Sequence, residues 1–307
     1  MSIPRDHHYL PQAYLERWTR NGKLFRYIRP RGAEGPLECK PKTPKGVAYK
    51  RDLYSLPDII DARDTQKLEL EFFQRIDDRA AVAIQKIERG ERGQSADRVA
   101  LAQFMISLLH RTPSRLQDIR DELSSTTDGA PYQGLEGADF DAKVKATANR
   151  LLAILVESPE GARIVGKLDI HLLKLGEGKP CFLTSDRPIT ISSQLIAPGA
   201  FMILPISPKS LVMLCNDKEI VRSFATQGDK RLAEGINQAI VEQAKEVVIA
   251  ANCDATRMID RLFLRPRASC EFDSIGLIRR KAPLTDFRVK VRAFSRDRKR
   301  DMLYLGL

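Results

Sequence analysis

The chain has 307 residues, of which 43% are hydrophobic and 30% are charged, and its net charge of +11 marks a basic globular protein. The first six residues lack the apolar core of a signal peptide, and the longest apolar runs are too short to cross a bilayer. The five cysteines are scattered without a CxxC pair, which argues against a tight zinc site or a disulfide framework. We therefore expect a reduced, cytoplasmic protein with no membrane partner.

The first expected element is a short helix that begins at Pro11, because proline suits the first helical turn, and that ends near Asn21. Residues 23–29 alternate in polarity and predict a strand. Residues 30–46 contain four prolines and three glycines and are expected to form a loop. An extended segment over residues 47–56 follows.

The middle of the chain predicts long helices. Apolar residues recur with a period close to 3.6 over residues 65–89, 96–111 and 139–157. Pro113 is expected to end the second of these helices. The Ser-, Thr- and Gly-rich stretch 124–138 is the best internal boundary.

Beyond Pro159 the pattern changes to short apolar runs broken by turns, with a fourth helix expected over residues 229–251. The expected strands are 168–175, 181–184, 189–193, 201–206, 211–215, 275–280 and 286–294. This order predicts an α+β fold, with a helical N-terminal half packed on a mostly antiparallel sheet from the C-terminal half. We expect one domain over residues 1–265, helix-rich to about residue 158 and strand-rich after it. A basic C-terminal extension with one or two strands would occupy residues 266–307.

The positive charge is concentrated at the two ends of the chain. Residues 1–62 carry 12 Lys and Arg against 7 Asp and Glu, and residues 266–307 carry 11 against 5, whereas residues 63–265 carry 28 of each. This segregation favours an anionic partner, and nucleic acid is the partner we expect. Two solvated basic ends without a partner are the alternative.

The last predicted strand adds a detail to that expectation. Arg288, Lys290 and Arg292 alternate with apolar residues and so share one face, along which a phosphate backbone could lie. An exposed edge strand protected by its charge is the alternative.

The most distinctive motif is His7-His8-Tyr9-Leu10-Pro11-Gln12, in which two of the four histidines are adjacent. It resembles the opening of the domain of unknown function 4238 family. Further motifs carry the same resemblance: Val47-Ala48-Tyr49, Asp52-Leu53-Tyr54, residues 76–81, Arg111-Thr112-Pro113, residues 184–189, residues 205–209 and Asn237. The resemblance covers about residues 5–265. It implies a single domain with these motifs in this order, and it implies no reaction.

Neighbouring side chains on an extended segment point in opposite directions, so His7 and His8 are not expected to bind one metal together. One of them would act as the acid–base group on a phosphodiester, or as a metal ligand, beside the N-terminal end of the Pro11 helix. Tyr9 and Gln12 would be binding residues at that end. Two structural histidines are the alternative.

Asp186 is the candidate partner of the histidine, as a metal ligand or as the carboxylate that orients the ring. An aspartate bonded to its own turn is the alternative. His110 and Arg111 end the 96–111 helix and would hold phosphate, although stabilisation of the helix dipole explains them equally. Asn237 completes the predicted binding residues.

No P-loop, dinucleotide fingerprint, EF-hand loop, H-E-x-x-H or G-x-S-x-G motif occurs, so no nucleotide cofactor is expected. Binding of Mg²⁺ or Mn²⁺ by His and Asp residues that are distant in the sequence remains an alternative. Together these features predict a nucleic-acid-acting protein, with a metal-dependent or histidine-based nuclease of defence or mobile-element type as the preferred form. The alternatives are a non-catalytic module that binds nucleic acid or protein, and an enzyme acting on a small anionic metabolite.

Overall fold

The computed structural model describes residues 5–91, 95–125, 134–178, 180–192, 195 and 199–265. The chain divides after Cys270 into two units, and all of the described residues belong to the first. The predicted extension, and with it Arg288, Lys290 and Arg292, lies outside the described residues. The boundary expected at residue 265 stays a prediction.

The first unit has an α+β fold, as the order of predicted elements indicated. Its helices are α1 (Gln12–Glu16), α2 (Gln74–Glu88), α3 (Ser95–His110), α4 (Pro113–Ser125), α5 (Gly137–Val156), α6 (Pro159–Gly166), α7 (Lys218–Ala225), α8 (Asp229–Gln243) and α9 (Thr256–Leu262), with 3-10 turns η1 (Pro44–Gly46) and η2 (Asp64–Gln66) and a π-helical segment η3 (Leu68–Phe73). Its strands are β1 (Asp6–His8), β2 (Leu24–Ile28), β3 (Glu38–Lys42), β4 (Tyr49–Arg51), β5 (Ile170–Lys174), β6 (Thr184–Ser185), β7 (Thr190–Ile191), β8 (Phe201–Pro205), β9 (Ser210–Cys215) and β10 (Val248–Ala250).

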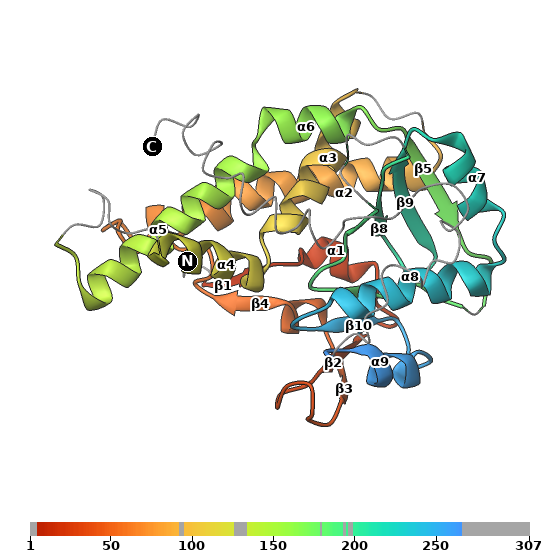
Figure 1. The fold of residues 1–307 in the computed structure, drawn as a ribbon, viewed down its shortest axis with the longest axis horizontal. Helices are drawn as coiled ribbons and strands as arrows, with labels where there is room; N and C mark the ends of the chain where they lie inside the picture. Colours follow the sequence, from red (N-terminus) through yellow and green to blue (C-terminus); the bar gives the residue numbers. More distant parts are fainter. Residues whose placement is uncertain are drawn as a thin grey trace. The chain divides into compact units, whose positions relative to one another are not determined.

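Two four-stranded antiparallel sheets and one two-stranded ladder make up the described β-structure. The first sheet has the order β3-β2-β10-β6, and it joins the two ends of the unit because Tyr27 pairs with Val248. The second sheet, β5-β9-β8-β7, is local in sequence, and every residue of β8 and β9 is buried. The ladder pairs β1 with β4. Figure 1 shows the first sheet beside α9 and the second beside α7.

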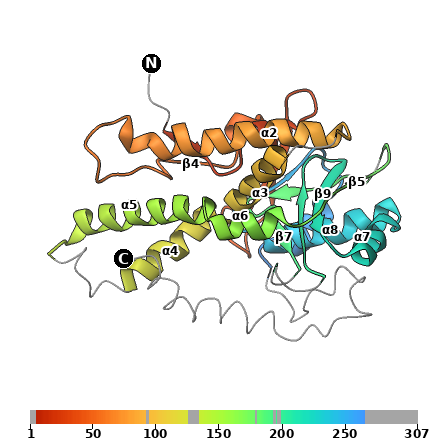
Figure 2. The same cartoon turned by 90° about the horizontal axis from the view of Figure 1, so that it is seen from above.

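Helix α1 ties the helical part to the strands. The Tyr14 ring packs against Trp18 and Phe104, with centroids 6.1 Å away in each case. Its hydroxyl lies 2.7 Å from Thr184 Oγ1 and donates to the Pro205 carbonyl at 2.7 Å. One aromatic side chain thus joins α1, α3 and both four-stranded sheets. Figures 1 and 2 show α3 crossing close to α2 within this helical part.

The predicted helices over residues 96–111 and 139–157 are confirmed as α3 and α5. The predicted helix over residues 65–89 is divided into η2, η3 and α2. None of the helices in the described ranges combines the length and the apolar character that crossing a membrane requires.

The structure differs from the sequence predictions in several details. Residues 30–46, expected to form a loop, contain strand β3, which pairs with β2 along its whole length. Helix α1 ends at Glu16, earlier than expected, because residues 17–19 turn into the Arg20–Lys23 bridge before β2. Helix α3 ends before Pro113, as predicted, but Pro113 also begins α4, which was not predicted, since proline at the first helical position loses no intrahelical hydrogen bond. Residues 248–250, expected in a helix, form the inner strand β10.

Candidate functional site

The His-His-Tyr motif lies in the interior: His7 and His8 end β1, and the buried Tyr9 follows directly. His7 stacks on Tyr54 with ring centroids 5.7 Å apart, and its Nδ1 accepts the Tyr54 backbone N–H at 2.9 Å. The His8 ring lies beside Tyr49, and its Nε2 is 3.3 Å from the Lys45 carbonyl oxygen. Burial lowers the pKa of His7 to about 4 and also lowers that of His8, so both imidazoles are neutral at pH 7.

The second nitrogen of His7 faces a polar chain of side chains. Because Nδ1 accepts a hydrogen bond, the ring proton of the neutral form is on Nε2, which has no hydrogen-bond partner among the described residues. Gln66 interacts with this ring and opposes the effect of burial on the His7 pKa. The Gln66 amide donates to Asp52 Oδ1 at 3.2 Å, and Arg5 Nε donates to the same atom at 2.9 Å. This chain links His7 to the exposed Arg5 side chain.

Arg111 connects the motif to the helices. Its side chain is fully buried directly after α3. Its Nε donates to the Tyr9 carbonyl at 3.0 Å, and its Nη1 donates to Asp77 Oδ1 at 2.8 Å. The Tyr54 hydroxyl donates to the Arg111 carbonyl at 2.6 Å. The structure therefore brings Arg111 and Tyr9 together. The protein itself binds Nε and Nη1 of the guanidinium, while Nη2 has no hydrogen-bond partner among the described residues.

A second carboxylate, that of Glu69, lies within electrostatic reach of the same guanidinium. Glu69 belongs to the π-helical segment η3, and its Oε1 is 3.4 Å from the backbone nitrogen of His8. Burial raises the pKa of Glu69 to about 7 and that of Asp77 to about 6, while Arg111 opposes both shifts. Two acids thus share one cation, and the pair titrates near neutral pH. Short π-helical segments are common at functional sites.

Glu69 and Asp77 were not predicted as site residues, although a signal was present. The two acids stand four residues before and four residues after the buried Phe73, so all three share one helical face. An acidic side chain on an apolar stripe needs a buried partner. Arg111, which the motif did single out, is that partner.

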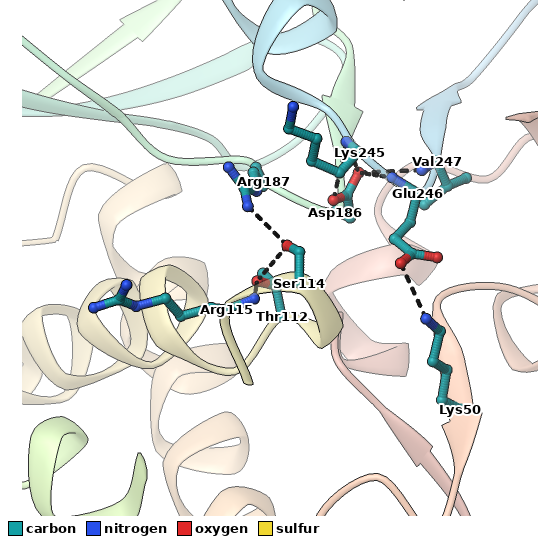
Figure 3. A network of polar contacts seen from close by, with 9 residues as sticks. All are labelled: Lys50, Thr112, Ser114, Arg115, Asp186, Arg187, Lys245, Glu246 and Val247. Atoms are coloured by element: carbon teal, nitrogen blue, oxygen red, sulfur yellow. Dashed lines mark hydrogen bonds and ion pairs between the residues drawn. The ribbon is translucent and has the colours of Figure 1, made fainter. Parts of the chain in front are cut away.

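Asp186 is fully buried, at the turn after β6. Its carboxylate accepts the backbone N–H groups of residues 245–247 at 3.0 to 3.2 Å (Figure 3). Burial raises the pKa of Asp186, and these hydrogen bonds oppose the shift. In the described part of the chain, no hydrogen bond joins Asp186 to His7 or His8. The carboxylate instead holds the turn that leads from α8 into β10.

The next residue, Arg187, links this turn to α4. Its Nη2 donates to Ser114 Oγ at 2.8 Å, and that hydroxyl is 3.3 Å from Thr112 Oγ1 (Figure 3). Thr112 Oγ1 also accepts the backbone N–H of Arg115 at 3.2 Å and so caps the first turn of the helix. The Arg-Thr-Pro and Thr-Ser-Asp-Arg-Pro motifs are therefore neighbours in space.

The remaining predicted binding residues are dispersed. Asn237 Oδ1 accepts the Leu183 N–H at 2.7 Å, and its Nδ2 donates to the Cys181 carbonyl at 2.9 Å. Asn237 thus holds the segment before β6 onto α8. His110 is the half-buried last residue of α3, and Gln12 is exposed on the single-turn helix α1.

Unpaired cations gather at one end of the β2–β3 ladder. Arg20 and Lys23 form the bridge that precedes β2, Lys42 on the edge strand β3 pairs with Leu24, and Lys45 follows in η1. We call Arg20, Lys23, Lys42 and Lys45 the basic edge. Lys42 is half-buried and the other three are exposed. None of the four has an acidic partner among the described residues. Charge on an edge strand also deters pairing with other chains, which is its structural alternative here.

The described residues contain no group of three or more His, Cys, Asp or Glu side chains placed to hold a metal ion. Within the described residues we therefore identify no set of ligands for the predicted Mg²⁺ or Mn²⁺.

Comparison with known proteins adds one finding. The model of a family described as Protein of unknown function (DUF4238) matches residues 6–254, in agreement with the resemblance noted in the sequence. No curated protein and no solved structure matches the chain.

Proposed function

The chain belongs to the DUF4238 family, and we propose that it binds nucleic acid through the phosphate backbone, at the basic edge. The observation that carries this proposal is the group of four cations without acidic partners. Such cations hold counterions, and a phosphate backbone that displaces the counterions gains affinity. The surplus of positive charge in residues 266–307 would add sequence-independent affinity.

The surroundings of the histidines support the binding form of this proposal over the nuclease form. His7 and His8 are buried, neutral and bound to the main chain of residues 45–54. The Asp186 carboxylate is bound to residues 245–247. We assign positioning roles to these three residues: they hold the β1–β4 ladder and the start of β10. Arg111 was first expected to bind phosphate. In this proposal the cations of the basic edge, which lack an acidic partner within the protein, bind it instead.

Fluorescence anisotropy with short single-stranded RNA, single-stranded DNA and duplex DNA tests the proposal. The double variant Lys23→Glu/Lys42→Glu should weaken binding about tenfold or more. It should also reduce the slope of log K against log salt by about two, roughly one for each lost phosphate contact. The matched control is Lys218→Glu/Lys230→Glu, which changes the net charge equally at exposed lysines of α7 and α8. Equal weakening by both double variants would show that only net charge matters, and the proposal would fail.

A cleavage assay separates binding from catalysis. Labelled RNA, single-stranded DNA and duplex DNA are incubated with the protein, with and without Mg²⁺ or Mn²⁺. We expect binding without turnover. Cleavage that is lost in His7→Ala or Asp186→Ala variants, with circular dichroism showing both variants to be folded, would instead establish the nuclease.

A further inference from the structure

Two inward-facing cations between α4 and α5 lack counterions. Arg120 on α4 and Lys145 on α5 are half-buried, and neither forms an ion pair with a described residue. The Arg120 Nε is buried without a hydrogen-bond partner, and its Nη2 reaches only the Leu53 carbonyl, at 3.5 Å. Burial lowers the pKa of both groups. Arg120 lowers the pKa of Lys145 further, and Asp52 opposes that shift. Figures 1 and 2 show the two helices side by side.

The acids of this region are already paired with other cations. Asp52 accepts hydrogen bonds from Arg5, including one of 2.9 Å from Nε. Asp58 is 2.7 Å from Arg150 Nη1 and 3.7 Å from Lys143 Nζ. Asp52 attracts Lys145 electrostatically without forming an ion pair with it, and neither Arg120 nor Lys145 has an ion-pair partner among the described residues. A desolvated charge without a partner is costly, and such charges are concentrated at binding sites.

Three buried side chains beside the 52–55 turn carry polar atoms that form no hydrogen bond of normal geometry: His7 Nε2, Gln66 Oε1 and Asn149 Oδ1. Of these, the Gln66 side chain still interacts with the His7 ring and raises the pKa of the imidazole. The side chains of these residues are almost completely buried, with exposures of 0%, 5% and 0%. Asn149 Nδ2 donates to the carbonyl oxygens of Leu53 and Ser55 at 3.2 and 2.8 Å, which leaves the amide oxygen free. Buried polar atoms in folded proteins nearly always have a partner, so a group of unpartnered ones points to a ligand or ordered water.

The two sets of groups belong to one place in the fold. His7 Nδ1 is held by the Tyr54 N–H, Asn149 by Leu53 and Ser55, and Arg120 by Leu53. Lys145 lies close enough to His7 to lower the pKa of the imidazole. The surroundings of this turn thus include two cations, one neutral N–H donor, an amide oxygen acceptor and the Asp52 carboxylate.

We propose that Arg120, Lys145 and His7 Nε2–H form a binding site for a phosphate group between α4, α5 and the 52–55 turn. A phosphate fits because it supplies negative charge and several acceptor oxygens at once, which matches a guanidinium, an ammonium and an imidazole N–H. Gln66 Oε1 and Asn149 Oδ1 would accept the proton of a monoanionic phosphate or a hydroxyl of its ester. None of these residues belongs to the basic edge, so the site is a second, separate one.

Calorimetry and thermal denaturation of the full-length protein with inorganic phosphate test the site, with chloride at equal ionic strength as the reference. Phosphate should raise the Tm of the wild-type protein, because a ligand bound only by the folded state stabilises it. The Arg120→Gln and Lys145→Gln variants should lose at least about tenfold in phosphate affinity, as expected for the loss of one charge-assisted contact. Lys143→Gln is the matched control on α5, because its cation already has Asp58 as a partner, and it should bind phosphate like the wild type.

Two outcomes would overturn the proposal. One is the absence of any phosphate effect on the wild type. The other is an equal phosphate response in Arg120→Gln, Lys145→Gln and Lys143→Gln, because binding would then come from other cations. The Lys23→Glu/Lys42→Glu variant should keep its full phosphate response, so failure of this site is distinguishable from failure of the nucleic-acid proposal.

Adenosine monophosphate and adenosine, measured in the same way, identify the source of the phosphate. Binding of the monophosphate with the affinity of inorganic phosphate would indicate a site for the phosphate group alone. Tighter binding of the monophosphate would indicate a nucleotide. Binding of adenosine as tight as that of the monophosphate would contradict a phosphate site.

Discussion

The inward-facing cations of this protein differ in whether an acidic side chain of the protein pairs with them; we call a cation with such an ion pair balanced and one without it unbalanced. Arg111 is bound by the Tyr9 carbonyl and Asp77, with Glu69 in reach, whereas Arg120 and Lys145 have no ion pair among the described residues. A balanced cation joins elements of the fold, and an unbalanced one remains available to an anion. Burial of a basic residue therefore does not identify a site, but burial without a counterion does.

The largest effect should follow removal of the balanced cation. Arg111→Ala is expected to lower the free energy of unfolding by about 3–5 kcal/mol, because it leaves two half-buried carboxylates without their fully buried cation. Urea denaturation at pH 7 measures this loss. Arg163→Ala, which removes a cation from an exposed pair with Glu160, is the control and should leave stability almost unchanged. A loss for Arg111→Ala as small as this control would remove the distinction between the two groups.

A smaller loss is expected for the buried anion of the C-terminal half. Asp186→Ala should lower the free energy of unfolding by about 1–3 kcal/mol, because the N–H groups of residues 245–247 lose their acceptor. Amide hydrogen exchange at those residues should become faster. Asp186→Asn keeps one acceptor oxygen, so its free energy of unfolding should lie between those of the wild type and the alanine variant. Unchanged exchange in Asp186→Ala would show that the carboxylate does not hold this turn.

The raised pKa of Glu69 predicts a pH dependence of stability. The pKa of Glu69 is raised to about 7 in the folded state, so the folded protein binds more protons than the unfolded chain between about pH 4.5 and 7. This contribution to stability is present below that range and is lost as the pH rises through about 7. Glu69→Gln, which cannot ionise, should therefore gain stability relative to the wild type as the pH increases.

Melting temperatures measured at a series of pH values check this dependence. Glu71→Gln, an exposed neighbour in the same π-helical segment, is the control and should follow the wild-type curve. A Glu69→Gln curve parallel to the wild type would mean that folding leaves the pKa of Glu69 unchanged.

The smallest effect should follow removal of an unbalanced cation in the absence of phosphate. Lys145→Gln is expected to change the free energy of unfolding by about 0.5 kcal/mol or less, or to raise it, because no ion pair is lost. Lys86→Gln offers the contrast, since Lys86 Nζ is 2.9 Å from the largely buried Asp97 carboxylate, and it should lose more stability. A larger loss for Lys145→Gln than for Lys86→Gln would show that Lys145 has a structural partner.

The parts of the fold that could be predicted from the sequence are those with a local cause. Helices α3 and α5 were predicted because their apolar residues repeat with the helical period. Strand β10 was assigned to a helix because three buried apolar residues after α8 fit either structure. The break before β10 is held by Asp186, which lies about 60 residues earlier in the chain. No local pattern contains that contact.

The same distinction applies to the candidate site. The sequence motifs singled out His7, Tyr9, Arg111 and Asp186, but they did not reveal which of these side chains are already bound within the protein. The unpartnered atoms of Arg120 and Asn149 were missed because each residue looks ordinary in its own helix. Their common feature is their position around the 52–55 turn, and only the tertiary structure shows it.

The pairing of β2 with β10 has a consequence for biosynthesis. Tyr27 and Val248, which are neighbours in the first sheet, are about 220 residues apart in the chain. On the ribosome, β2 emerges early and waits for its inner neighbour until almost the whole unit has been translated. Until then β2 has an open hydrogen-bonding edge, and a nascent chain that stalls in the middle exposes that edge to other chains or to chaperones.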